Sequence, residues 1–234
     1  MISCDPMRSL SNKWKLFGAP LLTALLASIF LLLILSAFRS ELAKPSLIHL
    51  DQHIQESVHS YTSVAATALM LTLTWIGSPK ILFALVPLLA ALFWWRHLRH
   101  EAAILLIAMA GSGILNTALK LHFRRIRPQV PWALVQERSF SFPSGHSVYA
   151  VVLYGTLAYL AMRYLRHAWQ RAAMIVAALL QILGIGLSRI YLGAHYPTDV
   201  AAGYFVGCIW LIAVILSDRT YVARRNQTPD TSRS

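Results

Sequence analysis

Charged residues are scarce in this chain of 234 residues: they make up 13% of it, whereas hydrophobic residue types make up 57%. The mean hydropathy is +0.56. A soluble domain carries about twice that share of charged residues, roughly 25%. Several apolar runs approach the roughly 20 residues needed to cross a bilayer. The composition therefore excludes an ordinary soluble domain and predicts an all-α integral membrane protein.

Acidic residues are also rare, with 9 Asp and Glu against 21 Lys and Arg. Such an excess can indicate nucleic-acid binding, but here the basic residues form short caps between apolar runs. That pattern is typical of topology signals and of contacts with anionic lipids. We therefore expect the bilayer, and no nucleic acid, as a partner. The two cysteines, Cys4 and Cys208, fall in the N-terminal tail and the last apolar run, so no disulfide is expected.

Six apolar runs are candidate spans: 17–38, 80–95, 102–119, 147–162, 171–188 and 200–217. A seventh stretch, 61–76, holds five Ser and Thr residues and is separated from the next run only by Gly77, Ser78 and Pro79. Six spans place the basic caps and both tails on one face, which the positive-inside rule makes cytoplasmic. We therefore predict a six-span bundle, with 49–77 as a largely helical segment lying on, or dipping into, the outer leaflet.

The expected organisation is one six-span domain over 17–217 between two cytoplasmic tails, 1–16 and 218–234. The second tail is polar and basic, and we expect it to be disordered shortly after Asp218. This topology belongs to a multi-pass protein of the cell (inner) membrane. It sends 120–146 and 189–199 to the extracytoplasmic face.

Three short segments at that face carry residues with chemical potential. LKLHFRRIRP ends at Pro128, PSGH covers 143–146, and SRIYLGAHYPTD covers 188–199. Basic residues placed against the topology bias need a reason, and an anionic ligand supplies one. The alternative is that their long side chains reach lipid phosphates at the interface.

The polar groups of these segments suit a phosphate. Ser144 and Gly145 lie where a helix is expected to begin, and free N–H groups with the helix dipole bind anions there. Lys120, Arg127 and Arg189 can converge on phosphate oxygens. The simpler reading of Ser144 is a helix cap.

Two histidines and one aspartate remain for chemistry. His146 and His195 can divide the roles of nucleophile and general acid, and spacing alone leaves open which one attacks. Asp199 lies four residues after His195 and can orient one of its ring nitrogens, or simply cap the last helix. Taken together, the three segments favour phosphoryl transfer.

The three segments follow the pattern Lys-x6-Arg-Pro, Pro-Ser-Gly-His and Ser-Arg-x5-His-x3-Asp without a departure. The sequence therefore resembles the type 2 phosphatidic acid phosphatase family of membrane lipid phosphatases, with motifs over 120–199. The resemblance implies that His195 forms a phosphohistidine, that His146 is the general acid and then the base, and that Asp199 orients His195. It implies phosphate binding by the remaining motif residues, Lys120, Arg127, Ser144, Gly145 and Arg189. It also implies a reaction without metal or other cofactor.

The substrate is less constrained than the family. Surplus basic residues next to the motifs, His122, Arg124, Arg125 and Arg138, suggest a second phosphate, as in undecaprenyl diphosphate; contact with bulk anionic lipid explains them equally well. Phosphatidylglycerophosphate and phosphatidic acid are the other candidates. A metal site is not expected, although His49, His53 and Glu56 can share a helix face.

Two other function classes fit some of the same residues. One is a transport or lipid-binding protein that keeps an anion site, which would need neither a nucleophile nor Asp199. The other is a vanadate-binding haloperoxidase relative, a soluble class that the six spans argue against.

Overall fold

The computed structural model describes residues 26–31, 33–37 and 39–227, and these are helical or irregular, with no strand among them. The expected tail 1–16 lies outside the described residues. After a helical stretch at 26–31 and 33–37, the elements are α2 (Arg39–Leu42), α3 (Pro45–His59), α4 (Val64–Ile76), α5 (Pro79–Trp95), α6 (Arg99–Phe123), α7 (Gly145–Ala161), α8 (Ala168–Tyr191) and α9 (Pro197–Gln227).

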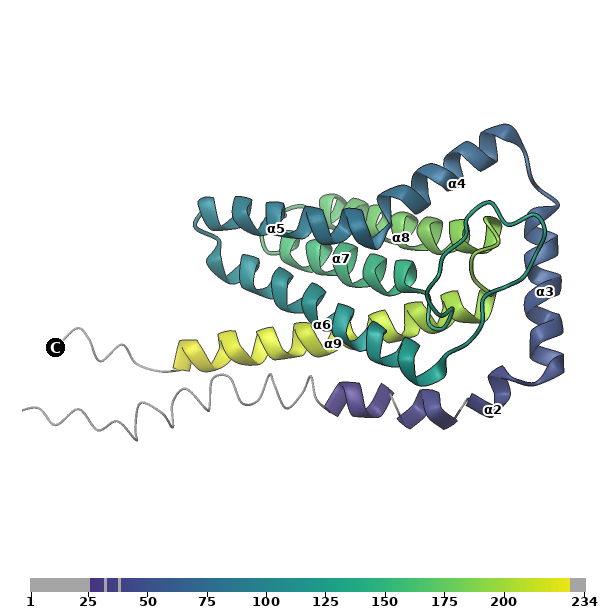
Figure 1. Cartoon of the computed structure of the whole chain (residues 1–234). Coiled ribbons are helices and arrows are strands. Elements are labelled where there is room, and N and C mark those ends of the chain that lie inside the picture. Colours follow the sequence, from purple (N-terminus) through teal and green to yellow (C-terminus); the bar gives the residue numbers. More distant parts are fainter. Residues whose placement is uncertain (1–25, 32, 38, 228–234) are drawn as a thin grey trace, which may run out of the picture.

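The helices α5 to α9 lie side by side in an elongated bundle (Figure 1). α3 crosses one end of the bundle, where the long 124–144 segment also lies (Figure 1). We call this end the site end. The sequence motifs all lie here, because α6 ends, α7 begins, α8 ends and α9 begins at this end.

The helix α7 forms the centre of the bundle and packs against α5, α6, α8 and α9. Val148 and Val152 on this helix are fully buried. Glycines on α9 let it approach α7 closely. A Cβ atom at Gly203 would lie 2.7 Å from the carbonyl oxygen of Ser144, and one at Gly207 would lie 2.7 Å from Cβ of Val151.

A sharp corner separates α4 from α5. Ser78 accepts a hydrogen bond from the amide of Ile81 at 3.3 Å, and Pro79 occupies the first turn of the new helix. The two helices are bent by 50° relative to each other, and α4 packs against α8. The stretch 49–77 is helical, as predicted, but it contains two separate helices, α3 and α4, and α4 with α5 forms a bent apolar pair. Its depth in the bilayer stays a prediction.

The hydroxyl groups of α4 do not prevent this helix from packing against its apolar neighbours. Thr72 donates to the carbonyl oxygen of Ala68 at 2.9 Å, inside its own helix. A hydroxyl satisfied in this way does not prevent a helix from packing in apolar surroundings.

Three of the described helices are long and apolar enough to cross a membrane on their own: α6, α8 and α9. The bent pair α4 and α5 gives a fourth if it is taken as one span. The count of six spans and the sidedness of the site stay predictions.

At the opposite end of the bundle, α9 continues as a helix through Gln227, so the prediction of disorder soon after Asp218 is wrong. The Asp218 carboxylate binds Nε2 of His100 at 2.5 Å, the Tyr159 hydroxyl at 2.5 Å and the Arg163 guanidinium. These contacts tie α9 to α6 and α7 beyond the apolar run.

Candidate active site

His195 and Asp199 form a buried pair at the junction of α8 and α9. Gly193, with φ of +72°, turns the chain after α8, and the amide of His195 donates to the carbonyl oxygen of Arg189 at 3.2 Å. Nδ1 of His195 lies 3.4 Å from Oδ2 of Asp199, which also accepts a hydrogen bond from the Ser141 hydroxyl. The Ser141 hydroxyl also lies 3.3 Å from Nδ1, so Asp199 and Ser141 together hold this ring nitrogen, and Nε2 faces the other way.

Nε2 of His195 lies 3.0 Å from the Arg127 guanidinium. The side chain of His195 is 1% exposed, and this burial lowers its pKa to about 4, although the hydrogen bond that the ring donates to Asp199 acts in the opposite direction. The positive charge of Arg127 lowers the pKa further in the same direction. The ring is therefore neutral near pH 7, which is the form that can attack an electrophile.

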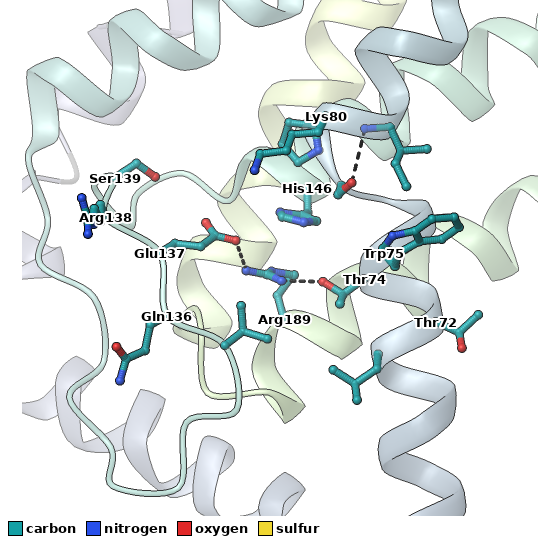
Figure 2. A pocket seen from close by; sticks show the side chains of 15 residues that line it. Thr72, Thr74, Trp75, Lys80, Gln136, Glu137, Arg138, Ser139, His146 and Arg189 are labelled. Atoms are coloured by element: carbon teal, nitrogen blue, oxygen red, sulfur yellow. Dashed lines mark hydrogen bonds and ion pairs between the residues drawn. The ribbon is translucent and has the colours of Figure 1, made fainter.

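A carboxylate that the sequence motifs do not contain, Glu137, joins two of the predicted phosphate-binding arginines. Its Oε2 accepts from Arg127 at 2.7 Å, and its Oε1 accepts from Arg189. Arg189 also donates to the Thr74 hydroxyl on α4, and Figure 2 shows Glu137, Arg189 and Thr74 in one row. Burial opposes the charge of Glu137, but the two arginines hold the pKa of Glu137 below its ordinary value.

The remaining predicted phosphate-binding residues lie around the same point. Lys120 at the end of α6 donates to the carbonyl oxygen of Phe140. The Ser144 hydroxyl caps α7, accepting from the hydroxyl of Ser147 at 3.0 Å, so the simpler reading of this side chain as a cap holds. The amide of Ser144 donates to the carbonyl oxygen of Asp199 at 3.0 Å, which ties the start of α7 to the start of α9. Gly145 is the first residue of α7.

A cavity of about 1150 Å³ opens at the corner of α4 and α5. His146, Arg189 and Glu137 line its polar side, and α4 supplies apolar residues such as Leu71 and Trp75 (Figure 2). His195 connects to this cavity through Arg127, which contacts both Glu137 and Nε2 of His195. The arrangement suits a ligand with an apolar body and an anionic group.

Sequence reasoning missed the residues that hold the His195–Asp199 pair from behind. Arg125 donates to Oδ1 of Asp199 at 2.6 Å and to Oδ2 of Asp51 at 2.9 Å. Gln55 donates to the carbonyl oxygen of His195 at 3.1 Å. The sequence shows that Asp51 and Gln55 are four residues apart and share one face of a helix, but it does not show what that face contacts.

The sequence left open whether Arg125 contacts a second phosphate or bulk anionic lipid, but both of its terminal nitrogens are bonded to carboxylates. His122 lies away from this point, with Nε2 at 3.1 Å from the Ser36 hydroxyl. Within the described part of the chain, no three His, Cys, Asp or Glu residues gather as a metal site would require, and this includes His49, His53 and Glu56.

The fold and the site define the chain as a helical membrane protein with a buried histidine–aspartate pair beside a cluster of arginines. The model of the PAP2 superfamily matches residues 101–222, which contain every motif, and the chain belongs to this superfamily. The family resemblance of the three motifs is thereby confirmed.

Known proteins of this superfamily are similar over much of the chain. Phosphatidylglycerophosphatase B of Bacillus subtilis is 33% identical over 147 residues, covering 62% of this chain and 71% of that protein. An undecaprenyl-diphosphatase of Sulfolobus acidocaldarius is 28% identical over 127 residues, covering 52% of this chain and 57% of that protein. The crystal structure of a transmembrane PAP2-type phosphatidylglycerolphosphate phosphatase from Bacillus subtilis superposes with a TM-score of 0.73 at 25% identity, covering 87% of this chain and 98% of the other.

Proposed function

We propose that this chain is a membrane lipid phosphatase that removes phosphate from a lipid phosphate or diphosphate through a phosphohistidine at His195. The observation that carries the proposal is the orientation of His195: Asp199 holds Nδ1, and Nε2 faces a cluster of cations. The similar proteins named as lipid phosphatases support it.

In the first step, Nε2 of His195 attacks the terminal phosphorus, and the bond from phosphorus to the leaving oxygen breaks. That oxygen is the lipid oxygen of a monophosphate or the bridging oxygen of a diphosphate, which leaves as the lipid monophosphate. His146, which faces the cavity, gives a proton to the departing oxygen. Nδ1–H of His195 donates to Asp199, so the positive charge that develops on the ring lies beside a carboxylate. In the second step, water loses a proton to His146 and attacks phosphorus, and the phosphorus–Nε2 bond breaks to release inorganic phosphate.

The phosphate must first exchange with Glu137. This carboxylate occupies Arg127 and Arg189, and Arg127 in turn covers Nε2 of His195. A phosphoryl group carries more negative charge than a carboxylate and offers three oxygens, so it can take over both guanidinium groups. Lys120 and the two arginines then balance the charge of the transition state, the task that metal ions perform in many other phosphoryl-transfer enzymes.

The proposed substrate is a diphosphate lipid such as undecaprenyl diphosphate, which the enzyme hydrolyses at the extracytoplasmic face. Lys80 at the start of α5 and Arg138 in the 124–144 segment line the cavity beyond Arg189. They can hold a second phosphate while the apolar wall of α4 contacts the chain of the lipid. Phosphatidylglycerophosphate and phosphatidic acid are the comparison substrates.

The test is a substrate panel on the purified full chain in detergent or lipid nanodiscs, with and without EDTA. We expect phosphate release that EDTA does not reduce, that is fastest with undecaprenyl diphosphate, and that the His195→Ala variant lacks. Release by that variant at the wild-type rate would refute the mechanism, and preference for monophosphates would refute the substrate class.

A further inference from the structure

Asp199 is fully buried, and its two carboxylate oxygens face different partners. Oδ2 faces Nδ1 of His195, accepts from the Ser141 hydroxyl and accepts from the amide of Tyr196 at 3.0 Å. Oδ1 accepts from Arg125 at 2.6 Å. A buried carboxylate without a cationic partner is costly, so the contact with Arg125 is part of what keeps Asp199 ionised.

Arg125 is itself held in place on three sides. One terminal nitrogen donates to Asp199 and to the Thr198 hydroxyl at 2.7 Å, and the other donates to Asp51 at 2.9 Å. The guanidinium lies over the ring of Tyr196, 4.3 Å from its centre. Its contacts with the two carboxylates also raise the pKa of Arg125 above its ordinary value, although burial acts against the charge.

The helix α3 supplies the outer part of this arrangement. Asp51, which is 1% exposed, accepts from the amide of Thr198 at 2.9 Å and from its hydroxyl at 2.6 Å, so it caps the first turn of α9 from another helix. One turn later, Gln55 donates to the carbonyl oxygen of His195. Gln55 and Asp51 of α3 therefore bond the segment from His195 to Asp199 near its two ends, at His195 and at Thr198.

We propose that Arg125, held by Asp51 of α3, is a positioning residue that orients Asp199 and serves as its cationic partner. This inference rests on the proposed function. It assigns a positioning role to α3 and to Arg125, which is one of the six residues that the Lys-x6-Arg-Pro pattern leaves unspecified. It also gives the arginines two different roles. Arg127 and Arg189 are bonded to Glu137 and can bind the phosphate when it replaces that carboxylate, whereas Arg125 is bonded to Asp51 and does not bind the phosphate.

Several charged groups act on the His195–Asp199 pair from the surrounding elements. They are Lys120 from α6, Arg125, Arg127 and Glu137 from the 124–144 segment, Arg189 from α8 and His146 from α7, and Asp51 from α3 acts on Arg125. Of these, Arg125 is the cation bonded to Asp199. Its removal takes positive charge from the pair, so protonation of His195 becomes easier and its pKa rises from about 4.

The first test is a double-mutant cycle on turnover of a lipid phosphate by the full chain. Arg125→Gln is expected to lower kcat roughly 10- to 100-fold, the usual effect of losing a partner that orients a reacting residue, with KM little changed. Adding Arg125→Gln to Asp199→Asn should cause no further loss, because Arg125 acts through that carboxylate. Asp51→Asn should lower kcat in the wild-type chain and leave the Asp199→Asn chain unchanged. Additive losses, or a rise in KM alone, would overturn the inference.

The matched control is Arg124→Gln, which removes the same charge from the neighbouring, exposed residue. Arg124 donates to the carbonyl oxygen of Leu121 at 3.1 Å and does not line the cavity, so the structure does not place it in the phosphate site. It should behave as wild type in the cycle. If Arg125→Gln does not fold, Arg125→Lys replaces it, keeping the charge but losing one arm; kcat should then fall while the folded fraction stays normal. A normal kcat in a folded Arg125→Lys chain would also contradict the inference.

A second readout does not need turnover. Hydrogen–deuterium exchange at the imidazole carbon between the two nitrogens, followed by mass spectrometry, gives the pKa of His195 directly. We expect that pKa to rise in Arg125→Gln and to stay unchanged in Arg124→Gln. An unchanged value in Arg125→Gln refutes the positioning role. A wild-type chain that turns over no lipid phosphate refutes the proposed function instead, and this titration then decides the positioning role alone.

Discussion

The bundle carries a histidine–aspartate pair near each end: His195–Asp199 at the site end and His100–Asp218 at the opposite end. In the first pair Nδ1 faces the carboxylate and Nε2 faces Arg127. In the second pair Nε2 itself binds the carboxylate at 2.5 Å, and the ring stacks on Tyr221. Only the first arrangement turns a ring nitrogen toward a cluster of cations.

The surroundings differ as well. Around Asp218, one guanidinium, Arg163, is shared with a second carboxylate, Glu101, at 3.6 Å. Around Asp199, cations from α6, α8 and the 124–144 segment meet, and a cavity lined by His146 lies beside them. A buried histidine–aspartate pair is therefore a structural element by itself. We infer that the neighbouring cations and the cavity suit the His195–Asp199 pair to phosphate chemistry.

The largest expected difference between the two ends comes from the histidines. His195→Ala should lower kcat with a lipid phosphate by about 10⁴-fold or more, because removal of a nucleophile leaves only binding and electrostatic effects. His100→Ala should keep the wild-type kcat and lower the thermal midpoint. Phosphate release and thermal unfolding of both variants give the comparison, and equal losses of activity would show that the two pairs do not differ as described.

The aspartates should separate the two ends by the quantity affected. Asp199→Asn is expected to lower kcat by about 10²- to 10⁴-fold, since the wrong ring tautomer of His195 is then favoured. Asp218→Asn should instead lower the free energy of unfolding by roughly 1–3 kcal/mol, because His100, Tyr159 and Arg163 lose a charged acceptor. A loss of activity in Asp218→Asn at unchanged stability would contradict this division.

A smaller effect is expected for the carboxylate that competes with phosphate. Glu137→Gln should bind orthophosphate about tenfold more tightly, a gain of about 1.4 kcal/mol, because two arginines lose their internal anion. The matched control is Glu101→Gln, which weakens an ion pair at the opposite end and should leave phosphate affinity unchanged. Competitive inhibition by orthophosphate measures both, and weaker inhibition in Glu137→Gln would show that Glu137 supports the phosphate site.

The smallest effect concerns pH. His195 has its ordinary pKa of 6.5 in the unfolded chain and about 4 in the folded chain, so the unfolded chain binds more protons between these values. The contribution of this group to stability therefore decreases as the pH falls from 6.5 toward 4. The same depressed pKa should keep the attacking nitrogen free, so the His195 contribution to kcat/KM should stay flat down to about pH 5. If kcat/KM instead falls below pH 6.5, and this fall disappears when another histidine is replaced, the fall reports the titration of that other histidine and not of His195.

Much of the site could be predicted because its motif residues are adjacent to helix ends. Lys120, His146, Arg189 and Asp199 come together as soon as four helix ends share one end of the bundle. The partners from α3 could not be predicted in this way. Asp51 lies 147 residues from Thr198, and no spacing rule connects a polar residue on an apparent surface helix with a distant loop.

The fold was predicted less completely, for a related reason. Counting apolar residues identifies α6, α8 and α9, whose lengths suffice alone. It leaves α4 ambiguous, because its threonines count as polar residues although Thr72 is satisfied within the helix and Thr74 binds Arg189. Glu137 was also missed, since a single acidic residue in a loop gives no sign that it pairs with two arginines.

The corner between α4 and α5 leaves α4 joined to α8 by polar contacts near both of its ends. Close to the corner, the Thr74 hydroxyl accepts from Arg189. At the other end, the Tyr191 hydroxyl lies 2.8 Å from the Thr67 hydroxyl and accepts from the amide of Ser63. A change in the angle of this corner would therefore disturb both contacts, including the one that holds the arginine.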